Sequence, residues 1–113
     1  MQTSRPVARL DEATDLTAAF VRLALPQPPA GATVFGVAEA ARPLFEGMPG
    51  LLAKVFTFDE KTGEALNVYL WESGIAARSF FTEAWLERIS RAYGAPPRVS
   101  FAKVAGLVDN IGR

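Results

Sequence analysis

The chain has 113 residues, half of them hydrophobic, with twelve basic and twelve acidic side chains and with no Cys and no His. This length and composition fit one domain with its own core, and the zero net charge gives no electrostatic reason to expect nucleic acid or an anionic membrane as a partner. Without Cys or His the chain cannot form a disulfide, a thiolate or imidazole metal site, a Ser–His couple or a haem site with a proximal His.

No stretch of the sequence reaches the roughly eighteen apolar residues that a membrane-spanning helix needs. The first apolar run is preceded by Asp11, Glu12 and Asp15 and is interrupted by Arg22, which is not the pattern of a signal peptide. We therefore expect a cytoplasmic protein that has neither a membrane nor a nucleic acid as its partner.

The first elements are a polar segment, a strand and a helix. Residues 1–14 are polar without a clear period, which predicts a flexible tail before a single domain over residues 15–113. The run LTAAFVRLAL (residues 16–25) predicts a strand, and the PQPPAG that follows it stops regular structure. Thr33 is expected to cap a helix over about residues 34–46. The expected apolar face of this helix consists of Val37, Ala38, Ala41, Leu44 and Phe45.

The middle of the chain predicts a β-hairpin. The runs LLAKVFTFD (residues 51–59) and LNVYLWES (residues 66–73) are both typical of strands. The linker EKTGE between them carries Gly63 where a hairpin loop favours a left-handed residue, so we expect the two strands to pair antiparallel.

A long helix and a last strand complete the chain. Ser73 and Gly74 are expected to open the helix, Gly94 and the two prolines after it to end it, and residues 99–108 to form the strand. The expected apolar stripe of the helix consists of Ala77, Phe81, Ala84, Trp85, Ile89 and Ala92. The order is β-α-β-β-α-β, an α+β ferredoxin-like pattern in which both helices cover one face of a four-stranded antiparallel sheet.

The third strand has an unusual second face, with an amide, a phenol and an indole in a row at Asn67, Tyr69 and Trp71. The other strands also divide into an aliphatic set and a set that mixes aromatic and charged side chains. The mixed sets are Phe20 with Arg22, Lys54 with Phe56 and Phe58, and Val99 with Phe101 and Lys103. If this grouping holds, neither face of the sheet belongs in water. The helices would cover one face and a second copy the other, so we expect a homodimer.

The cations of the mixed sets allow two interpretations. The stems of Arg22, Lys54 and Lys103 can lie along apolar surface while their charged ends reach solvent. Alternatively, some of them line a cavity and hold an anionic or carbonyl oxygen. Because an unpaired buried charge is costly, that arrangement would require a ligand or a carboxylate such as Glu72.

Two arginines of the long helix leave the same choice open. A helical wheel places Arg88 towards the sheet, where it either extends its charged end to solvent or stands at the mouth of a cavity. Arg78 flanks the same face near the helix start, where the helix dipole disfavours a cation. Asn67 needs a hydrogen-bond partner in either case, because Asn is disfavoured in the middle of a strand.

The order of elements and certain residues resemble a known group. The segments ARPLFEGMPGLLAKVFTF and LNVYLWES, the second followed by a long helix, resemble the YdhR-type monooxygenases of the dimeric α+β barrel superfamily. The resemblance covers about residues 16–110. It is carried by Pro43 within its helix, by the PGLLAKV turn and by Tyr69. It implies a homodimer whose two sheets form a barrel. It also implies kinship with antibiotic-biosynthesis monooxygenases, which oxidise electron-rich aromatics with O₂ and without metal or flavin.

The resemblance also implies where the site lies. In those relatives the substrate sits between the sheet and the helices, among Asn, Trp, Tyr and Arg residues. The corresponding catalytic candidates here are Asn67, Tyr69, Arg78 and Arg88. The substrate-binding candidates are Trp71, Phe81 and Trp85. No cofactor and no metal are expected, and haem is disfavoured because the haem-degrading relatives use a His.

The leading hypothesis is a dimeric, cofactor-independent monooxygenase of secondary metabolism that acts on an aromatic or polyketide-like small molecule. Asn67 and an Arg would stabilise an enolate or phenolate oxygen, and the substrate carbanion would itself reduce O₂. Two alternatives stay open: a non-oxidative cyclase or isomerase of the same fold, and a dimer that binds a small molecule without catalysis.

Overall fold

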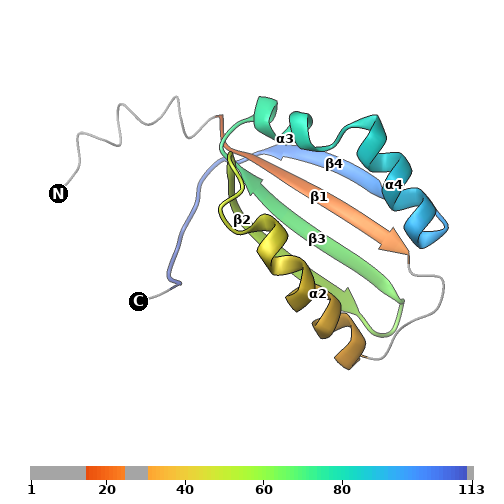
Figure 1. Ribbon diagram of the computed structural model, residues 1–113. Coiled ribbons are helices and arrows are strands. Elements are labelled where there is room, and N and C mark those ends of the chain that lie inside the picture. Colours follow the sequence, from red (N-terminus) through yellow and green to blue (C-terminus); the bar gives the residue numbers. More distant parts are fainter. Residues whose placement is uncertain (1–14, 25–30, 112–113) are drawn as a thin grey trace, which may run out of the picture.

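The structure is a computed structural model that describes residues 15–24 and 31–111 (Figure 1). The predicted tail, residues 1–14, lies outside the described residues. The elements in chain order are β1 (Thr17–Ala24), α2 (Gly31–Phe45), β2 (Leu51–Asp59), β3 (Glu64–Trp71), α3 (Gly74–Phe80), α4 (Glu83–Tyr93) and β4 (Arg98–Lys103). The predicted α+β ferredoxin-like fold is confirmed, with the second helix divided in two.

The strands form one antiparallel sheet in the order β2-β3-β1-β4. In the central strand β1, Val21 lies opposite Asn67 of β3 on one side and Val99 of β4 on the other. The predicted hairpin of β2 and β3 is confirmed, and Gly63 in its loop has a φ of 74°. Glycine adopts this left-handed conformation without steric cost, which is why the loop can close tightly.

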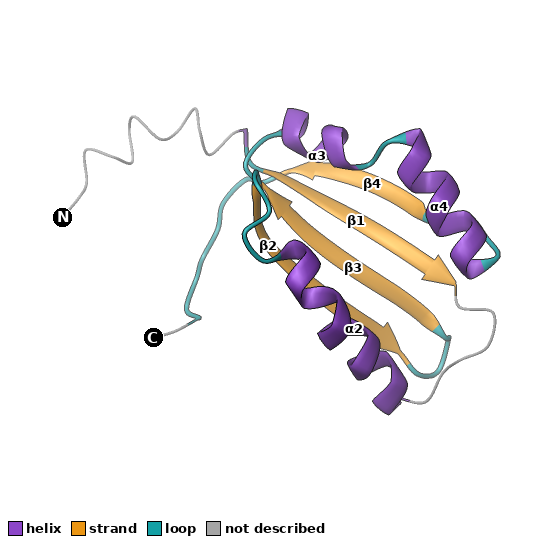
Figure 2. Ribbon diagram, viewed as in Figure 1, coloured by secondary structure: helices purple, strands orange, loops and turns teal. Residues whose placement is uncertain are grey.

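The helices of the described chain lie against one face of the sheet. Figure 2 shows α2 along the β2 side of the sheet and α3 and α4 along the β4 side. Phe45 of α2 and Phe80 of α3 both approach Tyr69 of β3, with ring centroids 6.1 and 5.8 Å away. Phe81, after α3, stands 5.0 Å from Tyr69 and 5.0 Å from Trp85 of α4. The core therefore sits between β3 and the helices.

The predicted single helix after Ser73 is wrong, because the chain forms two helices there. Ser73 caps α3 as expected, but α3 ends at Phe80 and α4 begins at Glu83. Thr82 between them has extended backbone, and its hydroxyl oxygen accepts a hydrogen bond from the Trp85 N–H at 3.1 Å. This is the geometry of a helix N-cap. A new helix start at Thr82 therefore replaces continuous helix.

The buried faces of the helices are narrower than the sequence predicts. α2 begins at Gly31, so Thr33 lies inside the helix and does not cap it. Val37 and Leu44 are 56% and 71% exposed, which leaves the contact with the sheet to fewer residues. Of the stripe expected on the second helix, the exposed members are Ala84 and Ala92. The break at Thr82 shifts the phase of that stripe.

The covered face of the sheet combines both kinds of strand face. The aliphatic set of β1 lies against the helices together with the mixed sets of β2, β3 and β4, so the grouping by chemistry holds within each strand and not across the sheet. Ala19 of β1, for example, lies between Tyr69 of β3 and Phe101 of β4. Small side chains on the central strand leave room for the large rings on its neighbours, and Ala19 and Val21 are fully buried there.

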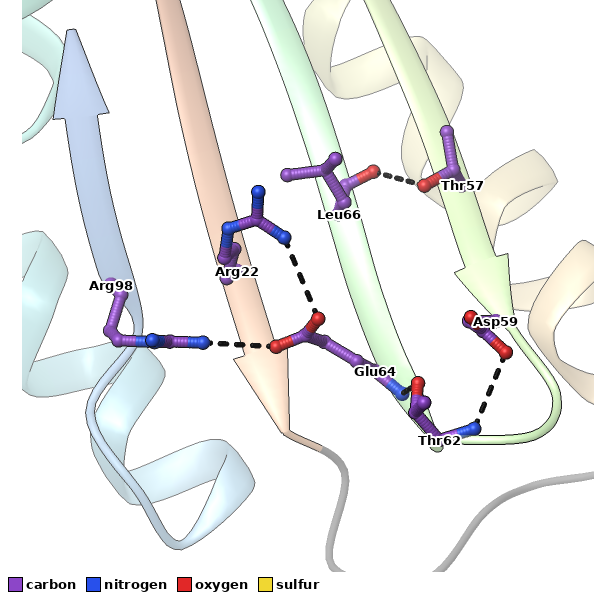
Figure 3. Close-up of polar contacts among 7 residues, drawn as sticks. All are labelled: Arg22, Thr57, Asp59, Thr62, Glu64, Leu66 and Arg98. Atoms are coloured by element: carbon purple, nitrogen blue, oxygen red, sulfur yellow. Dashed lines mark hydrogen bonds and ion pairs between the residues drawn. The ribbon is translucent and has the colours of Figure 1, made fainter.

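The opposite face of the sheet carries no helix in the part of the chain that the structure describes. Its apolar side chains include Ala18, Phe20, Val55, Leu66, Val68 and Leu70; we refer to these six as the open face. At its edge Glu64 forms ion pairs with Arg22 at 3.5 Å and with Arg98 at 3.0 Å (Figure 3). Arg22 therefore lies away from the helices, and its carboxylate partner is Glu64, not Glu72.

Strand boundaries differ from the prediction where other structure competes for the backbone. β3 ends at Trp71 because Ser73 already accepts a hydrogen bond from the Ala76 N–H at 3.0 Å and so begins α3. β4 ends at Lys103 and not near residue 108. The N–H of Val104 still donates a hydrogen bond to the carbonyl of Leu16, the residue before β1. Beyond Val104, the side chains of Leu107 and Val108 are exposed.

Candidate functional site

An aromatic cluster fills the space between the sheet and the helices. It is built around Tyr69 and Trp71 of β3, each 2% exposed. Phe81 presents its edge to both rings, with centroid distances of 5.0 and 6.1 Å. The other members are Phe45, Phe80 and Trp85. Edge-to-face and stacked rings attract one another beyond simple area burial, which helps to stabilise this cluster. It brings four predicted site residues together: Tyr69, Trp71, Phe81 and Trp85.

The indole N–H of Trp71 is buried and has no acceptor among the described residues. A buried donor without a partner costs about 1–3 kcal/mol. Gly50 lies close to the same indole: a Cβ at Gly50 would be 3.8 Å from Cε3 of Trp71 and 3.1 Å from Cβ of Ala76. The indole is thus closely packed, and its N–H is a buried donor without an acceptor among the described residues.

Asn67 lies on the covered face, between Val21 of β1 and Phe56 of β2. Its side chain is partly buried and makes no hydrogen bond with another described residue. The sequence required a partner for this amide, and none of the described side chains or backbone groups supplies it. The amide therefore offers a donor and an acceptor beside the aromatic cluster.

The phenol of Tyr69 is a proton donor at neutral pH. Burial raises the pKa of Tyr69 above its ordinary value of 10.0, and the nearby Tyr93 raises it further by charge repulsion. The protonated phenol can donate a hydrogen bond, or it can relay a proton by giving up its own and taking up another. It cannot act as the base that begins a reaction.

Lys54 is a site residue that the sequence left between two interpretations. Its Nζ lies 3.5 Å from the ring centroid of Phe45, 4.2 Å from that of Phe56 and 4.4 Å from that of Tyr69. Burial lowers the pKa of Lys54 from 10.5 to about 7. The rings oppose this shift, because their negative faces favour the ammonium form by about 2 kcal/mol or more when the cation is desolvated. Since one pKa unit corresponds to about 1.4 kcal/mol, desolvation prevails and the pKa stays below its ordinary value.

The signal for Lys54 was present in the sequence. Lys54 lies in the middle of a strand and shares its face with Phe56 and Phe58. Either its ammonium extends past that apolar face to solvent, or burial lowers its pKa. The strand pattern alone does not show which of these occurs, because the rings that surround Nζ include Phe45, which comes from α2.

Two surface clefts lie along α2 and β2. The first has a volume of about 300 Å³, and its lining includes Phe45, Lys54 and Phe56. The second has a volume of about 670 Å³, and its lining includes Phe35, Phe56 and Phe58. Asn67, Trp71 and Trp85 line neither cleft. Open space near Asn67 therefore lies beside its β2 neighbour Phe56, which borders both.

Arg78 lies apart from the aromatic cluster. Its guanidinium folds over Gly74, and it borders a cleft of about 440 Å³ together with Thr17 and Lys103. Thr17 lies opposite Trp71, and Asn67 is four residues before Trp71 on β3. Four residues of strand separate the two positions by about 13 Å. The structure does not bring Arg78 and Asn67 together.

Arg88 is exposed on α4, although the helical wheel placed it towards the sheet. The buried stripe of α4 follows Trp85 and Ile89, and Arg88 lies at its flank. Neither candidate arginine therefore contacts Asn67 in the described structure.

The polar groups that the covered face offers near the rings are an amide, an indole N–H, a phenol and an amine. Within residues 15–24 and 31–111 no three Asp or Glu residues gather in a way that could hold a metal ion. None of the described helices is long and apolar enough to cross a membrane.

No protein-family model matches this chain, and no curated protein matches it. Several solved structures share its fold. NE2512 from Nitrosomonas europaea, a protein of unknown function, is 16% identical with a TM-score of 0.65, over 88% of this chain and 99% of that one. The monooxygenase from the gene ActVA-Orf6 of Streptomyces coelicolor, in complex with nanaomycin D, is 20% identical with a TM-score of 0.60, over 88% and 96%.

SnoaB from Streptomyces nogalater, a cofactor-independent oxygenase, is 12% identical with a TM-score of 0.58, over 85% of this chain and 99% of that one. Two further neighbours are described as antibiotic biosynthesis monooxygenases, from Bordetella bronchiseptica and Caulobacter crescentus. At these identities the comparisons show the fold alone: the chain has the fold of the antibiotic-biosynthesis monooxygenases.

Proposed function

We propose that this protein is a cofactor-independent monooxygenase that acts on an electron-rich aromatic or polyketide-like small molecule. The observation that carries the proposal is the amide of Asn67, which has no hydrogen-bond partner among the described residues, beside the rings of Tyr69 and Trp71 on the sheet face that the helices cover. The fold shared with oxygenases and the resemblance of the sequence to the YdhR-type group support it.

The chemistry of these groups suits a substrate that carries its own reducing power. Asn67 donates a hydrogen bond to the oxygen of an enolate or phenolate, and the indole N–H of Trp71, which has no acceptor in the described part of the chain, is a second donor. The anion then reduces O₂ itself. For a methylene flanked by aromatic rings, one oxygen atom becomes the ketone oxygen, and the other leaves as water with the two hydrogen atoms of the methylene. Tyr69 relays a proton.

The proposal includes a homodimer. The open face would bury its apolar side chains against the same face of a second copy, because a soluble chain seldom leaves such a continuous patch in water. The ring of Phe20 and the side chains of Val68 and Leu70 lie in its middle strands. A two-fold dimer of this kind leaves the helix-covered site of each copy on the outside of the barrel of sheets.

The test is O₂ uptake with dithranol, a dihydroxyanthrone, and with a substituted hydroquinone, measured above the enzyme-free rate. Removing the donor with Asn67→Ala should lower kcat by about 10²–10³. Asn110→Ala is the matched control, because Asn110 is exposed in the C-terminal segment, and should leave kcat unchanged. Equal rates for wild type and Asn67→Ala would rule out this site. Arg78→Ala and Arg88→Ala test the two arginines in the same assay.

The same assay separates the alternatives. A cyclase or isomerase would use the same hydrogen bonds to an oxyanion and would convert its substrate without O₂, so turnover under anaerobic conditions would favour it. The dense packing of Phe45, Phe80 and Phe81 on Tyr69 is the observation that favours a binding dimer. Ligand binding without any turnover would favour a dimer that binds a small molecule and does not catalyse a reaction.

A further inference from the structure

Lys54 is held in an aromatic environment on the covered face of the sheet. Its Nζ is within 4.4 Å of three ring centroids, which belong to Phe45, Phe56 and Tyr69. In the described part of the chain no carboxylate lies within ion-pair distance of it. A permanent ammonium in such a place lacks the counter-charge that a buried cation normally has.

The charged groups around Lys54 do not replace that counter-charge. From α2, Arg42 and Glu46 border the same cleft, but Glu46 is paired with Arg42 at 3.3 Å. From β3, the facing titratable group is Tyr69, which is neutral because burial raises its pKa. Burial lowers the pKa of Lys54 below its ordinary value, so the uncharged amine is populated at a lower pH than in an ordinary lysine.

The proposed oxygenation requires a base, and the predicted site residues do not supply one. The amide of Asn67 and the indole of Trp71 have no basic atom, and Tyr69 begins protonated. A guanidinium does not act as a base in proteins, which excludes the two candidate arginines. An amine with a free electron pair is the group that this set lacks.

Lys54 and Asn67 are neighbours across the hairpin. Lys54 lies opposite Tyr69 in the register of β2 and β3, and Asn67 lies opposite Phe56. Lys54 and Asn67 are thus diagonal neighbours on one face, about 7–8 Å apart at the backbone. Both side chains therefore face the same side of the sheet, and the rings of Phe56 and Tyr69 stand beside Lys54 Nζ. The cleft that Lys54 and Phe56 line opens Lys54 to solvent.

We propose that the Lys54 amine is the base that removes the substrate's proton, while Asn67 holds the oxygen on which the negative charge settles. The O–H or C–H bond of the substrate breaks, its electron pair stays on the substrate, and the proton forms a new N–H bond on Lys54. The substrate becomes an anion and Lys54 an ammonium, whose charge the rings of Phe45 and Tyr69 stabilise. This inference rests on the proposed function and adds its proton acceptor.

The first experiment follows the amine itself. The chain has three lysines, Lys54, Lys61 and Lys103, so protein labelled with ¹³C at lysine Cε should show three signals by NMR, assigned with Lys61→Arg and Lys103→Arg. We expect one signal, that of Lys54, to titrate well below the ordinary 10.5 and towards about 7. Titration of Lys54 at the ordinary value would overturn the proposal, because the amine would then be fully charged near neutral pH.

The second experiment measures O₂ uptake with dithranol as a function of pH. In the wild-type chain the rate should rise with pH through the NMR midpoint of Lys54 and then level off, because only the uncharged amine accepts a proton. Lys54→Met should lower kcat/KM by about 10²–10⁴, the usual contribution of a general base, and should lose this pH limb. Lys54→Arg keeps the length and the charge and should be equally inactive, which keeps the test valid if Lys54→Met does not fold.

The matched control is Lys61→Met, since Lys61 is exposed in the hairpin loop, where its backbone N–H donates a hydrogen bond to the Asp59 carboxylate. It should retain the wild-type rate and pH profile. Wild-type activity in Lys54→Met or Lys54→Arg would overturn the role of Lys54 and leave the monooxygenase intact. No O₂ uptake by the wild-type chain with either substrate class would overturn the proposed function and the role of Lys54 with it.

Discussion

Tyr69 and Trp71 lie two residues apart on β3 and stack with their ring centroids 6.0 Å apart and their planes 7° from parallel. Phe81 stands at nearly right angles to both, at 86° and 83°. Neighbours on the same face of a strand are held at a set spacing by the backbone, so a third ring that meets both edge-on prevents either from tilting. The indole N–H that lacks an acceptor is therefore fixed in direction, which favours a role in orienting a ligand.

Gly50→Ala should destabilise the protein through two separate effects. Gly50 has a φ of 84°, and an added Cβ would stand 3.1 Å from Cβ of Ala76. Gly47 has a similar φ of 75° but open space around it, and Gly106 has open space. Left-handed backbone costs a non-glycine residue about 1–2 kcal/mol. In urea unfolding we expect Gly50→Ala to lose most, Gly47→Ala about 1 kcal/mol, and Gly106→Ala little; equal losses at Gly50 and Gly47 would show that the contact with Ala76 does not matter.

Thr82→Ala should weaken the start of α4. The Thr82 hydroxyl accepts the hydrogen bond from the Trp85 N–H, and loss of an N-cap of this kind costs about 1 kcal/mol. Thr82→Asn should restore most of the loss because Asn is an effective N-cap. Thermal unfolding followed by circular dichroism checks both. A Thr82→Ala protein as stable as wild type would mean that Phe80 and Phe81, not the cap, hold the helix break.

Val68→Lys should convert the proposed dimer to a monomer. Val68 lies in the middle of the open face, between Phe20 of β1 and Val55 of β2. A lysine placed there in a closed interface would be a buried charge without a partner, which costs several kcal/mol. Val37→Lys is the control, because Val37 is exposed on α2. Light scattering should give a dimer for wild type and for Val37→Lys; a wild-type monomer would contradict the homodimer.

Stability should rise with pH above neutrality because of Lys54. Burial lowers the folded-state pKa of Lys54 to about 7, whereas the unfolded chain keeps 10.5, so between these values the unfolded chain binds more protons. The penalty is fully present below about pH 7 and is lost as the pH rises to about 10.5. Partial exposure and the cation–π contacts reduce it to about 1–2 kcal/mol. Urea unfolding of wild type and Lys54→Met at about pH 7 and pH 9.5 should show this slope in the wild type alone; parallel behaviour would contradict the shift.

Part of the candidate site could be predicted from residue types and period alone. The alternation of Asn67, Tyr69 and Trp71 places them on one face of a strand whatever the strand packs against, and the structure keeps them together. Phe81 and Trp85 join them through ring contacts with Tyr69 and with each other. The arginines could not be placed in this way. A single helical wheel does not apply to Arg78 and Arg88, because Thr82 begins a new helix between them.

Period, turn chemistry and composition determined the order of elements, the hairpin at Gly63, the antiparallel sheet and the mixed polar and aromatic face of β3, because each depends on residues close together in the chain. Tertiary structure alone decided which strand faces meet the helices, since that depends on the register of β1 between β3 and β4. It also decided which rings surround the Lys54 amine. Phe45 is nine residues before Lys54 and Tyr69 fifteen after it, and only folding brings their rings around one amine.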